Sequence, residues 1–265
     1  MKRILLVAAP RSSSCTPLSG EPDHRAILAV VLVVLVVSPS VASAGTVRPW
    51  LGAHGSLATY RMSDVNSDVN NFNAHAWSGL QMDEIHGGLG VGAAFGLDLP
   101  GRVSVGLGYD HLYASSDVGD ASGSLKFDLP ANAFRGFLQY SFAGVGPSGA
   151  YLGGSLGIVS ESGSVLVPVV GCDRCAIALP AFEKRDIKGS GGLFELFAGG
   201  DWWAAVQVPH GRPEPVFALS GMTGYRYAKI GETKVNGETV YLANGEKESI
   251  DYSGVFARVG FKVAL

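Results

Sequence analysis

Hydrophobic and polar residues alternate along eight segments of this 265-residue chain. The clearest segment is 85–99, "IHGGLGVGAAFGLDL", where apolar side chains occupy one side and mostly glycine occupies the other. A period of two residues is typical of a β-strand, whereas an amphipathic helix repeats every 3.6 residues. The other segments are residues 50–60, 102–115, about 124–143, 150–161, 193–207, 216–230 and 254–265. None of them has a helical period, so the pattern predicts an all-β domain.

The connections between these segments alternate in length. Those after the second, fourth and sixth segments are short: "PG", "GVGPSG" and "VPHGRPEP". Those at about 63–84, 116–123, 162–192 and 231–248 are mostly longer and polar. Short turns at one rim and long loops at the other are typical of transmembrane barrels, and an even strand number places both termini at the short-turn rim. The predicted fold is an eight-stranded antiparallel up-and-down transmembrane β-barrel.

The second face of the segments decides between a membrane barrel and a soluble one. In a soluble, lipocalin-like barrel this face would meet water, and soluble surfaces carry roughly 25–35% charged residues. Here the face is mostly Gly and Ser, and only 16% of the whole chain is charged. Small residues suit the crowded interior of a narrow barrel. Aromatic residues near the segment ends resemble interfacial girdles; they are Tyr109, Tyr113, Tyr140, Phe142, Tyr225 and Tyr227. The membrane barrel is favoured.

The N-terminal region predicts export. Residues 26–37, "AILAVVLVVLVV", form an apolar run that is too short for a membrane helix, which needs about 20 residues. Ala42-Ser43-Ala44 has the form of a signal-peptidase site, so residues 1–44 are predicted to be a signal peptide cleaved after Ala44. The alternative is a retained anchor. The barrel domain is then 45–265, with 16 basic and 21 acidic residues and a net charge of −5. It has no basic stripe for nucleic acid.

The last segment stays apolar on one face to the final residue, with Val259, Phe261, Val263 and Leu265 at alternate positions. In topology, alternation and closing strand, residues 45–265 resemble the small eight-stranded outer-membrane β-barrel proteins of Gram-negative bacteria. The resemblance implies that these four residues form the signal recognised by the barrel-assembly machinery. The family most often ends in Phe, and this chain ends in Leu265. The alternative is an ordinary edge strand that happens to end the chain.

Charged residues also occur on the inward phase of the strands. The predicted interior charge network is Asp110, Arg135, Glu195, Asp201, Arg226, Arg258 and Lys262. Mixed charges in a narrow interior should pair, because an unpaired buried ion is costly. The short turn near His210 and Gly211 places Glu195 opposite Arg226. Asp110 and Arg135 are expected to form a second contact. The alternative is that Glu195 and Arg226 extend to the outer mouth and stay solvated.

Two sets of residues could carry chemistry. Cys172 and Cys175 lack further His or Cys ligands for zinc and lack a helical redox context, so a local disulfide is predicted, with a redox or metal role as the alternative. Two free thiols in the unreduced protein would refute that prediction. His111, with Ser115 and Ser116 nearby in sequence, is the best catalytic candidate. The alternative is that His111 is a noncatalytic residue of the aromatic belt. No cofactor or metal motif is present, and no enzymatic activity is expected.

The sequence therefore predicts a plugged barrel that acts as a membrane anchor or structural envelope protein. Its termini would be periplasmic and its long loops extracellular, displayed for surface interaction with an extracellular or envelope ligand. A monomer surrounded by outer-membrane lipid is expected. The alternatives are a narrow solute channel, for which a barrel of this size is small, and an outer-membrane lipid-modifying hydrolase.

Two local features are also predicted. Asn236-Gly237 should form the turn of a hairpin in the last long loop. The apolar phase flips between Leu129 and Phe134, which predicts a bulge or bend within 129–134 around Pro130.

Overall fold

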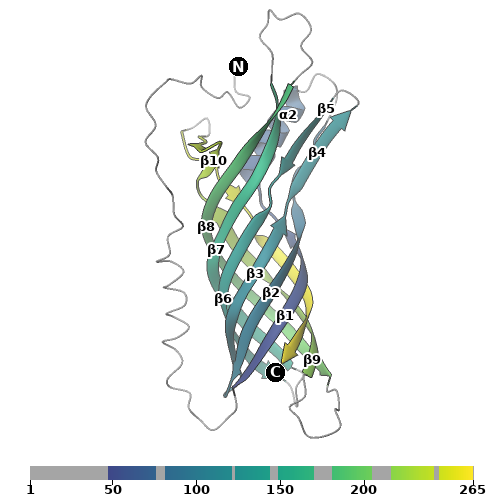
Figure 1. The fold of residues 1–265 in the computed structure, drawn as a ribbon, viewed down its shortest axis with the longest axis vertical. Helices are drawn as coiled ribbons and strands as arrows, with labels where there is room; N and C mark the ends of the chain where they lie inside the picture. The colour runs from purple at the N-terminus through teal and green to yellow at the C-terminus, as the bar shows by residue number, and fades with distance from the viewer. Residues whose placement is uncertain are drawn as a thin grey trace, which may run out of the picture.

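The computed structural model describes residues 47–75, 81–120, 123–143, 149–169, 181–204, 216–241 and 245–264. Eight strands close into one antiparallel barrel, because the last strand pairs with the first (Figure 1). These strands are β1 (Arg48–Thr59), β2 (Gly87–Leu99), β3 (Val103–Tyr113), β6 (Ala131–Ala143), β7 (Gly149–Val169), β8 (Ala181–Ala204), β9 (Val216–Ile230) and β13 (Gly254–Ala264). The predicted eight-stranded barrel is confirmed. The predicted signal peptide lies outside the described residues, as do Cys172, Cys175 and Leu265.

The two ends of the barrel differ. At one end Trp50 pairs with Ala264, and β2 turns into β3 through Gly101 and Arg102, both with positive φ. At the other end the structure adds β4 (Ser115–Asp120), β5 (Gly123–Asp128), β10 (Thr233–Val235), β11 (Glu238–Thr239), β12 (Ile250–Asp251) and a helix (Figure 1). We refer to these as the turn end and the loop end.

Much of what was expected to be loop is folded at the loop end. β7 and β8 stay paired from Gly149 and Asp201 to Val169 and Ala181, well past the predicted ends of their segments. The expectation of a long polar loop over 162–192 is therefore wrong at both ends of that range, because the two strands pair with each other beyond the barrel wall. The hairpin prediction at Asn236-Gly237 is confirmed: both residues have positive φ, and Val235 pairs with Glu238.

The one helix among the described residues, α2 (Ser63–His75), is not part of the all-β prediction. Its signal is the repeat "SDVN" at 63–66 and 67–70, which places Val65 and Val69 one helical turn apart. Both valines are buried. Val65 packs into an apolar core at the loop end of the barrel, and Val69 packs against Met82. The side-chain amide of Asn66 donates to the Ile85 carbonyl at 3.1 Å and accepts from the Ile85 amide at 2.8 Å. No helix in the described residues is long and apolar enough to cross a membrane.

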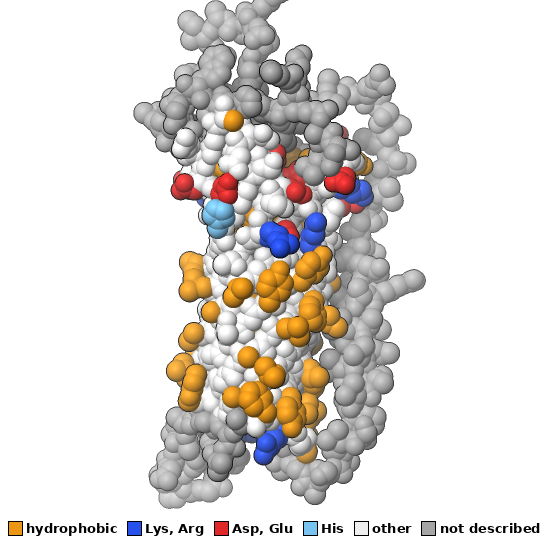
Figure 2. Space-filling view, turned by 180° about the vertical axis from the view of Figure 1, so that it is seen from behind, with side chains coloured by type: hydrophobic (Ala, Val, Ile, Leu, Met, Phe, Trp, Pro, Cys, Tyr) orange, Lys and Arg blue, Asp and Glu red, His pale blue; other side chains and the backbone are white. Residues whose placement is uncertain are grey.

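Outward-facing apolar side chains form a belt around the barrel (Figure 2). On β9 the belt runs from Phe217 to Tyr227, which is about 33 Å along a strand. The next outward residue on that strand is the exposed Lys229. Other exposed members are Leu51, Leu57, Leu89, Val91, Phe95, Leu107, Leu138, Leu152, Leu156, Leu196, Leu219, Val255, Val259 and Phe261. Soluble monomers rarely expose apolar patches above a few hundred Å².

Of the bulge or bend predicted within 129–134, the bulge is wrong. The strand is interrupted at Leu129 and Pro130, inside the predicted range, but Asp128 still pairs with Ser164 and Ala131 with Glu161, so no residue is inserted. The apolar phase flips for another reason. Leu129 points into an apolar core at the loop end, whereas Phe134 lies on the outward belt. The pattern changes because the apolar surroundings move from inside the barrel to outside it.

Candidate functional site: the charged barrel interior

Five charged side chains from five strands meet inside the barrel. We call Asp110 (β3), Arg135 (β6), Glu195 (β8), Arg226 (β9) and Arg258 (β13) the charge cluster; each is at most 5% exposed. The pair read from the short turn is present: Glu195 lies opposite Arg226, and Arg226 Nε donates to Glu195 Oε1 at 2.8 Å. Arg135 Nε donates to Asp110 Oδ2 at 2.9 Å.

Arg258 joins the two pairs. Its Nη2 donates to Glu195 Oε1 at 2.7 Å and to Asp110 Oδ2 at 3.2 Å, and its Nη1 donates to Glu195 Oε2 at 3.2 Å. Ser155 Oγ donates to the same Glu195 oxygen at 2.9 Å. The guanidinium carbon of Arg258 also lies 4.3 Å from the centre of the Phe256 ring, a cation–π distance. The cluster is thus one network that ties five strands together across the lumen.

His54 also belongs to this network and is an addition to the residues predicted from the sequence. Its Nε2 lies 2.6 Å from Asp110 Oδ1. Since an ionised carboxylate only accepts hydrogen bonds, this nitrogen carries the proton. His54 is on β1 and Asp110 is on β3, so the pair must pass over β2, where both residues align with Gly92. A Cβ at Gly92 would lie 2.5 Å from His54 Nε2, so glycine makes the contact possible.

The same use of glycine recurs around the lumen. A Cβ at Gly108 would lie 2.9 Å from the guanidinium carbon of Arg135, and one at Gly96 would lie 2.3 Å from the Trp50 ring. Inward glycines therefore act as sockets that receive large side chains from neighbouring strands. The glycine-rich second face that favoured a narrow interior is explained by these contacts.

An aromatic layer adjoins the charge cluster; four of its five members lie toward the turn end, and Phe256 lies one inward position toward the loop end from Arg258 on β13. It consists of Trp50, Phe137, Tyr151, Phe197 and Phe256, all buried. Within it, Lys262 Nζ donates to Asp201 Oδ2 at 2.7 Å and lies 4.6 Å from the centre of the Trp50 ring. The predicted network therefore splits into two parts: five members form the charge cluster, and Asp201 and Lys262 form a separate pair closer to the turn end.

An apolar core closes the other side of the cluster. Its largest members include Tyr60, Met62, Leu129, Ile230 and Tyr252. Tyr252 donates its hydroxyl to the Leu129 carbonyl at 2.9 Å, and helix α2 contributes Val65 to the same core. In the described part of the chain, the lumen is thus filled in three layers: apolar core, charge cluster and aromatic layer.

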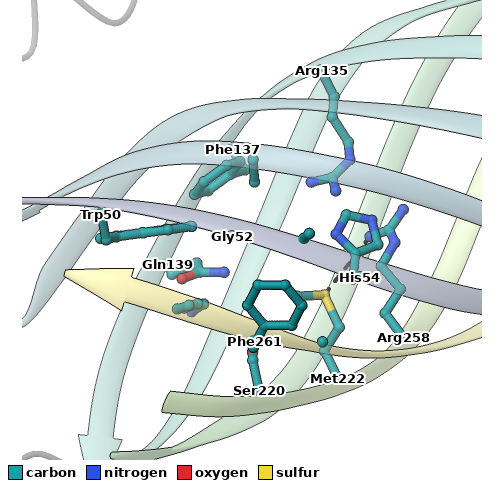
Figure 3. A pocket seen from close by; sticks show the side chains of 14 residues that line it. Trp50, Gly52, His54, Arg135, Phe137, Gln139, Ser220, Met222, Arg258 and Phe261 are labelled. Atoms are coloured by element: carbon teal, nitrogen blue, oxygen red, sulfur yellow. Dashed lines mark hydrogen bonds between the residues drawn. The ribbon is translucent and has the colours of Figure 1, made fainter. Parts of the chain in front are cut away.

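A small cavity lies inside the described part of the barrel, with a volume of about 30 Å³. Figure 3 shows it between Trp50 and Phe137 on one side and Arg258 and Met222 on the other. A cavity of this size holds about two water molecules. It is far below the roughly 300–1,000 Å³ of a site for a drug-sized ligand.

The catalytic candidate is not assembled. His111 Nδ1 lies 2.8 Å from Asn132 Oδ1, and the His111 ring packs against Tyr113 on the outward side. Ser116 is buried and donates to the Asp83 carbonyl, and Ser115 is on the exposed face. Within the described ranges no group of three or more His, Cys, Asp or Glu side chains has the geometry to hold a metal ion.

The proposed assembly signal lies on β13. Val259 and Phe261 are exposed on the outward belt, and Val263 is half-buried. The recognition role of these residues and of Leu265 stays a prediction.

Comparison with known proteins gives structural likeness at low sequence identity. No protein-family model and no curated protein matches the chain. The solved structures similar to it include Neisserial surface protein A, at 13% identity and a TM-score of 0.43 over 83% of this chain and 99% of that one. Ail, the attachment invasion locus protein of Yersinia pestis, is 10% identical with a TM-score of 0.38 over 82% and 99%. The Escherichia coli outer membrane protease OmpT is 10% identical with a TM-score of 0.27 over 82% and 93%.

Proposed function

We propose that this chain is an outer-membrane β-barrel protein with a plugged interior, which anchors and displays the structures at its loop end. The observation that carries the proposal is the inversion of polarity across the barrel wall: apolar side chains face outward, and ion pairs lie inside. At a strand tilt of 35–45°, the belt on β9 is about 25 Å tall, which matches the apolar band of transmembrane barrels.

The aromatic residues of the belt support the same membrane-spanning arrangement. Tyr225 and Tyr227 are exposed near the loop end of β9, whereas Phe142 and Trp202 are exposed near the turn end of their strands. Aromatic rings at two levels are typical of the two membrane–water interfaces. Because transmembrane barrels have short periplasmic turns and longer extracellular loops, the loop end faces the cell exterior and the turn end faces the periplasm.

The filled lumen favours an anchor over a solute channel. The charge cluster spans the lumen and the apolar core lies above it, so a hydrated solute would have to break buried ion pairs to pass. The folded elements at the loop end are then the parts available to an extracellular or envelope ligand. They include α2, the β4–β5 hairpin and the β10–β11 hairpin.

Electrophoretic mobility of the purified protein tests the membrane barrel. A folded membrane barrel should resist sodium dodecyl sulfate until it is boiled, so the unboiled and boiled samples should migrate differently. Equal mobility, together with recovery in the soluble fraction of the periplasm, would contradict the proposal.

Planar-bilayer recording tests the plug. We expect no steady single-channel conductance from the wild-type protein. Steady conductance would favour the channel.

Protease treatment of intact cells tests the orientation, because only an outward loop end would be cleaved without lysis. Protection of the loop end would reverse the orientation.

A further inference from the structure

The charged residues that line the interior cavity are all positive. Its polar residues are His54, Arg135, Gln139, Ser220, Arg258 and Lys262. Asp110, Glu195 and Asp201 are engaged with the cations and are not part of the lining. Figure 3 shows Arg135 reaching toward His54 and Arg258 from the opposite wall, while Gln139 lies beside Trp50 with its amide pointing toward these three side chains.

The charges of the lumen do not balance. At the level of the charge cluster and the aromatic layer, Arg135, Arg226, Arg258 and Lys262 pair with the three carboxylates Asp110, Glu195 and Asp201. Asp98 also reaches the aromatic layer, where it accepts from Trp50 Nε1 at 3.1 Å, but it aligns with Arg48 on β1 and that pair leaves the difference unchanged. One positive charge is in excess. An unbalanced charge is costly inside a narrow barrel whose outer wall is apolar.

Glu161 does not supply the missing negative charge. It lies on β7 near the loop end, above the belt, at the level where Asn132 and Ser160 face outward. Burial, with Glu248 nearby, raises the pKa of Glu161 to about 8, so this carboxyl is mostly protonated at neutral pH. Val159 and Ala133 lie between its level and that of Arg135.

Buried nitrogen donors in the same region also lack acceptors. Arg258 Nε and both terminal nitrogens of Arg226 have no hydrogen-bond partner among the described residues. Buried polar groups are almost always satisfied, because each unsatisfied donor costs free energy. Arg258 lines the cavity directly.

We propose that the cavity binds one small monovalent inorganic anion, which in ordinary salt solutions is chloride. One such ion balances the single excess charge and accepts hydrogen bonds from the cationic and amide donors of the wall. The volume of about 30 Å³ leaves room for an ion of this size and excludes a lipid headgroup, a sugar or a nucleotide. The competing occupant is a pair of water molecules, which would satisfy donors but leave the charge unbalanced.

Bromide diffraction tests the site directly. Crystals of the full chain grown in sodium bromide should give one anomalous peak inside the cavity. Density for water alone, with no anomalous signal at saturating bromide, would overturn the proposal.

Stability measurements provide a second test. The thermal midpoint of the detergent-solubilised protein should rise with chloride and then saturate, at constant ionic strength maintained with gluconate, which is too large for the cavity. A midpoint that does not respond to chloride would overturn the proposal.

A variant that places a carboxylate of the protein in the cavity tests the same charge balance without a bound anion. Gln139→Glu places a negative charge in the cavity, so the chloride dependence and the bromide peak should both disappear. The control Gln81→Glu makes the same change at an exposed residue of the loop end, and it should keep the wild-type chloride dependence.

Equal chloride dependence in Gln139→Glu and the wild type would contradict the site. If that variant fails to fold, bromide diffraction on the wild-type protein decides. The results of these tests are independent of electrophoretic mobility and membrane location. The anion site and the proposed function can therefore fail separately.

Discussion

Removal of the charge of Glu195 should destabilise the barrel strongly. Glu195 accepts hydrogen bonds from Arg226 Nε, from two nitrogens of Arg258 and from Ser155 Oγ, and Arg135 Nε lies 3.5 Å from its Oε2. Glu195→Gln keeps the size of the side chain but leaves three guanidinium groups facing Asp110 alone. Loss of one partner of a buried ion pair typically costs about 3–5 kcal/mol.

The assay is urea-induced unfolding of the protein in lipid vesicles, followed by tryptophan fluorescence. The control is Glu238→Gln on β11, where the side chain is exposed. A surface change of this kind should alter the free energy of unfolding by no more than about 0.5 kcal/mol. If Glu195→Gln stays within about 1 kcal/mol of this control, the charge cluster does not stabilise the barrel as argued.

A double-mutant cycle isolates the pair itself. Glu195→Gln and Arg226→Met together should cost less than the sum of the two single changes, because removal of Arg226 lowers the charge excess that Glu195→Gln creates. Contacting residues in one network typically couple by about 0.5–3 kcal/mol. Additive effects would show that Glu195 and Arg226 do not interact in the folded protein, despite the 2.8 Å contact.

Three further predictions concern a socket, a group of acids and the helix. Gly92→Ala should destabilise by about 1–3 kcal/mol, since the new Cβ would lie 2.5 Å from His54 Nε2; thermal unfolding should show no such loss for Gly55→Ala, which has no neighbour closer than 4.0 Å. Burial, helped by neighbouring carboxylates including Asp64, raises the pKa values of Glu161 to about 8, Glu248 to about 7 and Asp68 to about 6. The folded state therefore binds more protons than the unfolded state over this range, and the thermal midpoint should fall as pH rises from about 4 to 8; an equal slope in Glu161→Gln would contradict the contribution of that residue. Asn66→Ala removes both hydrogen bonds to Ile85 and should speed proteolysis of 63–85 in the folded protein; the comparison is Asn70→Ala, which loses one exposed contact to Glu84.

The barrel strands and much of their register follow from the amino-acid sequence alone. A period of two assigns each residue to a face, and a short turn then aligns the two strands that it joins. That is why the sequence predicts the pair of Glu195 and Arg226 and the hairpin around Asn236-Gly237 that β10 and β11 form. These features depend only on neighbours along the chain or across one turn.

Other features depend on whether the apolar surroundings of a segment lie inside or outside the barrel. The apolar phase flip between Leu129 and Phe134 was read as an inserted residue, but it marks the level where the barrel wall passes from an inner core to an outer belt. Helix α2 was missed because it is short and polar, and its two valines become informative only when the barrel mouth offers them a core.

The centre of the charge cluster, in contrast, depends on closure of the barrel. Arg258 and Asp110 are 148 residues apart, and they meet because β13 closes against β1 and their side chains cross the lumen. His54 reaches Asp110 over an intervening strand, which succeeds only because Gly92 leaves space there. Alternation tells which side chains point inward, but contact across the lumen depends on closure of the sheet, on the depth of each residue and on the absence of a Cβ between them.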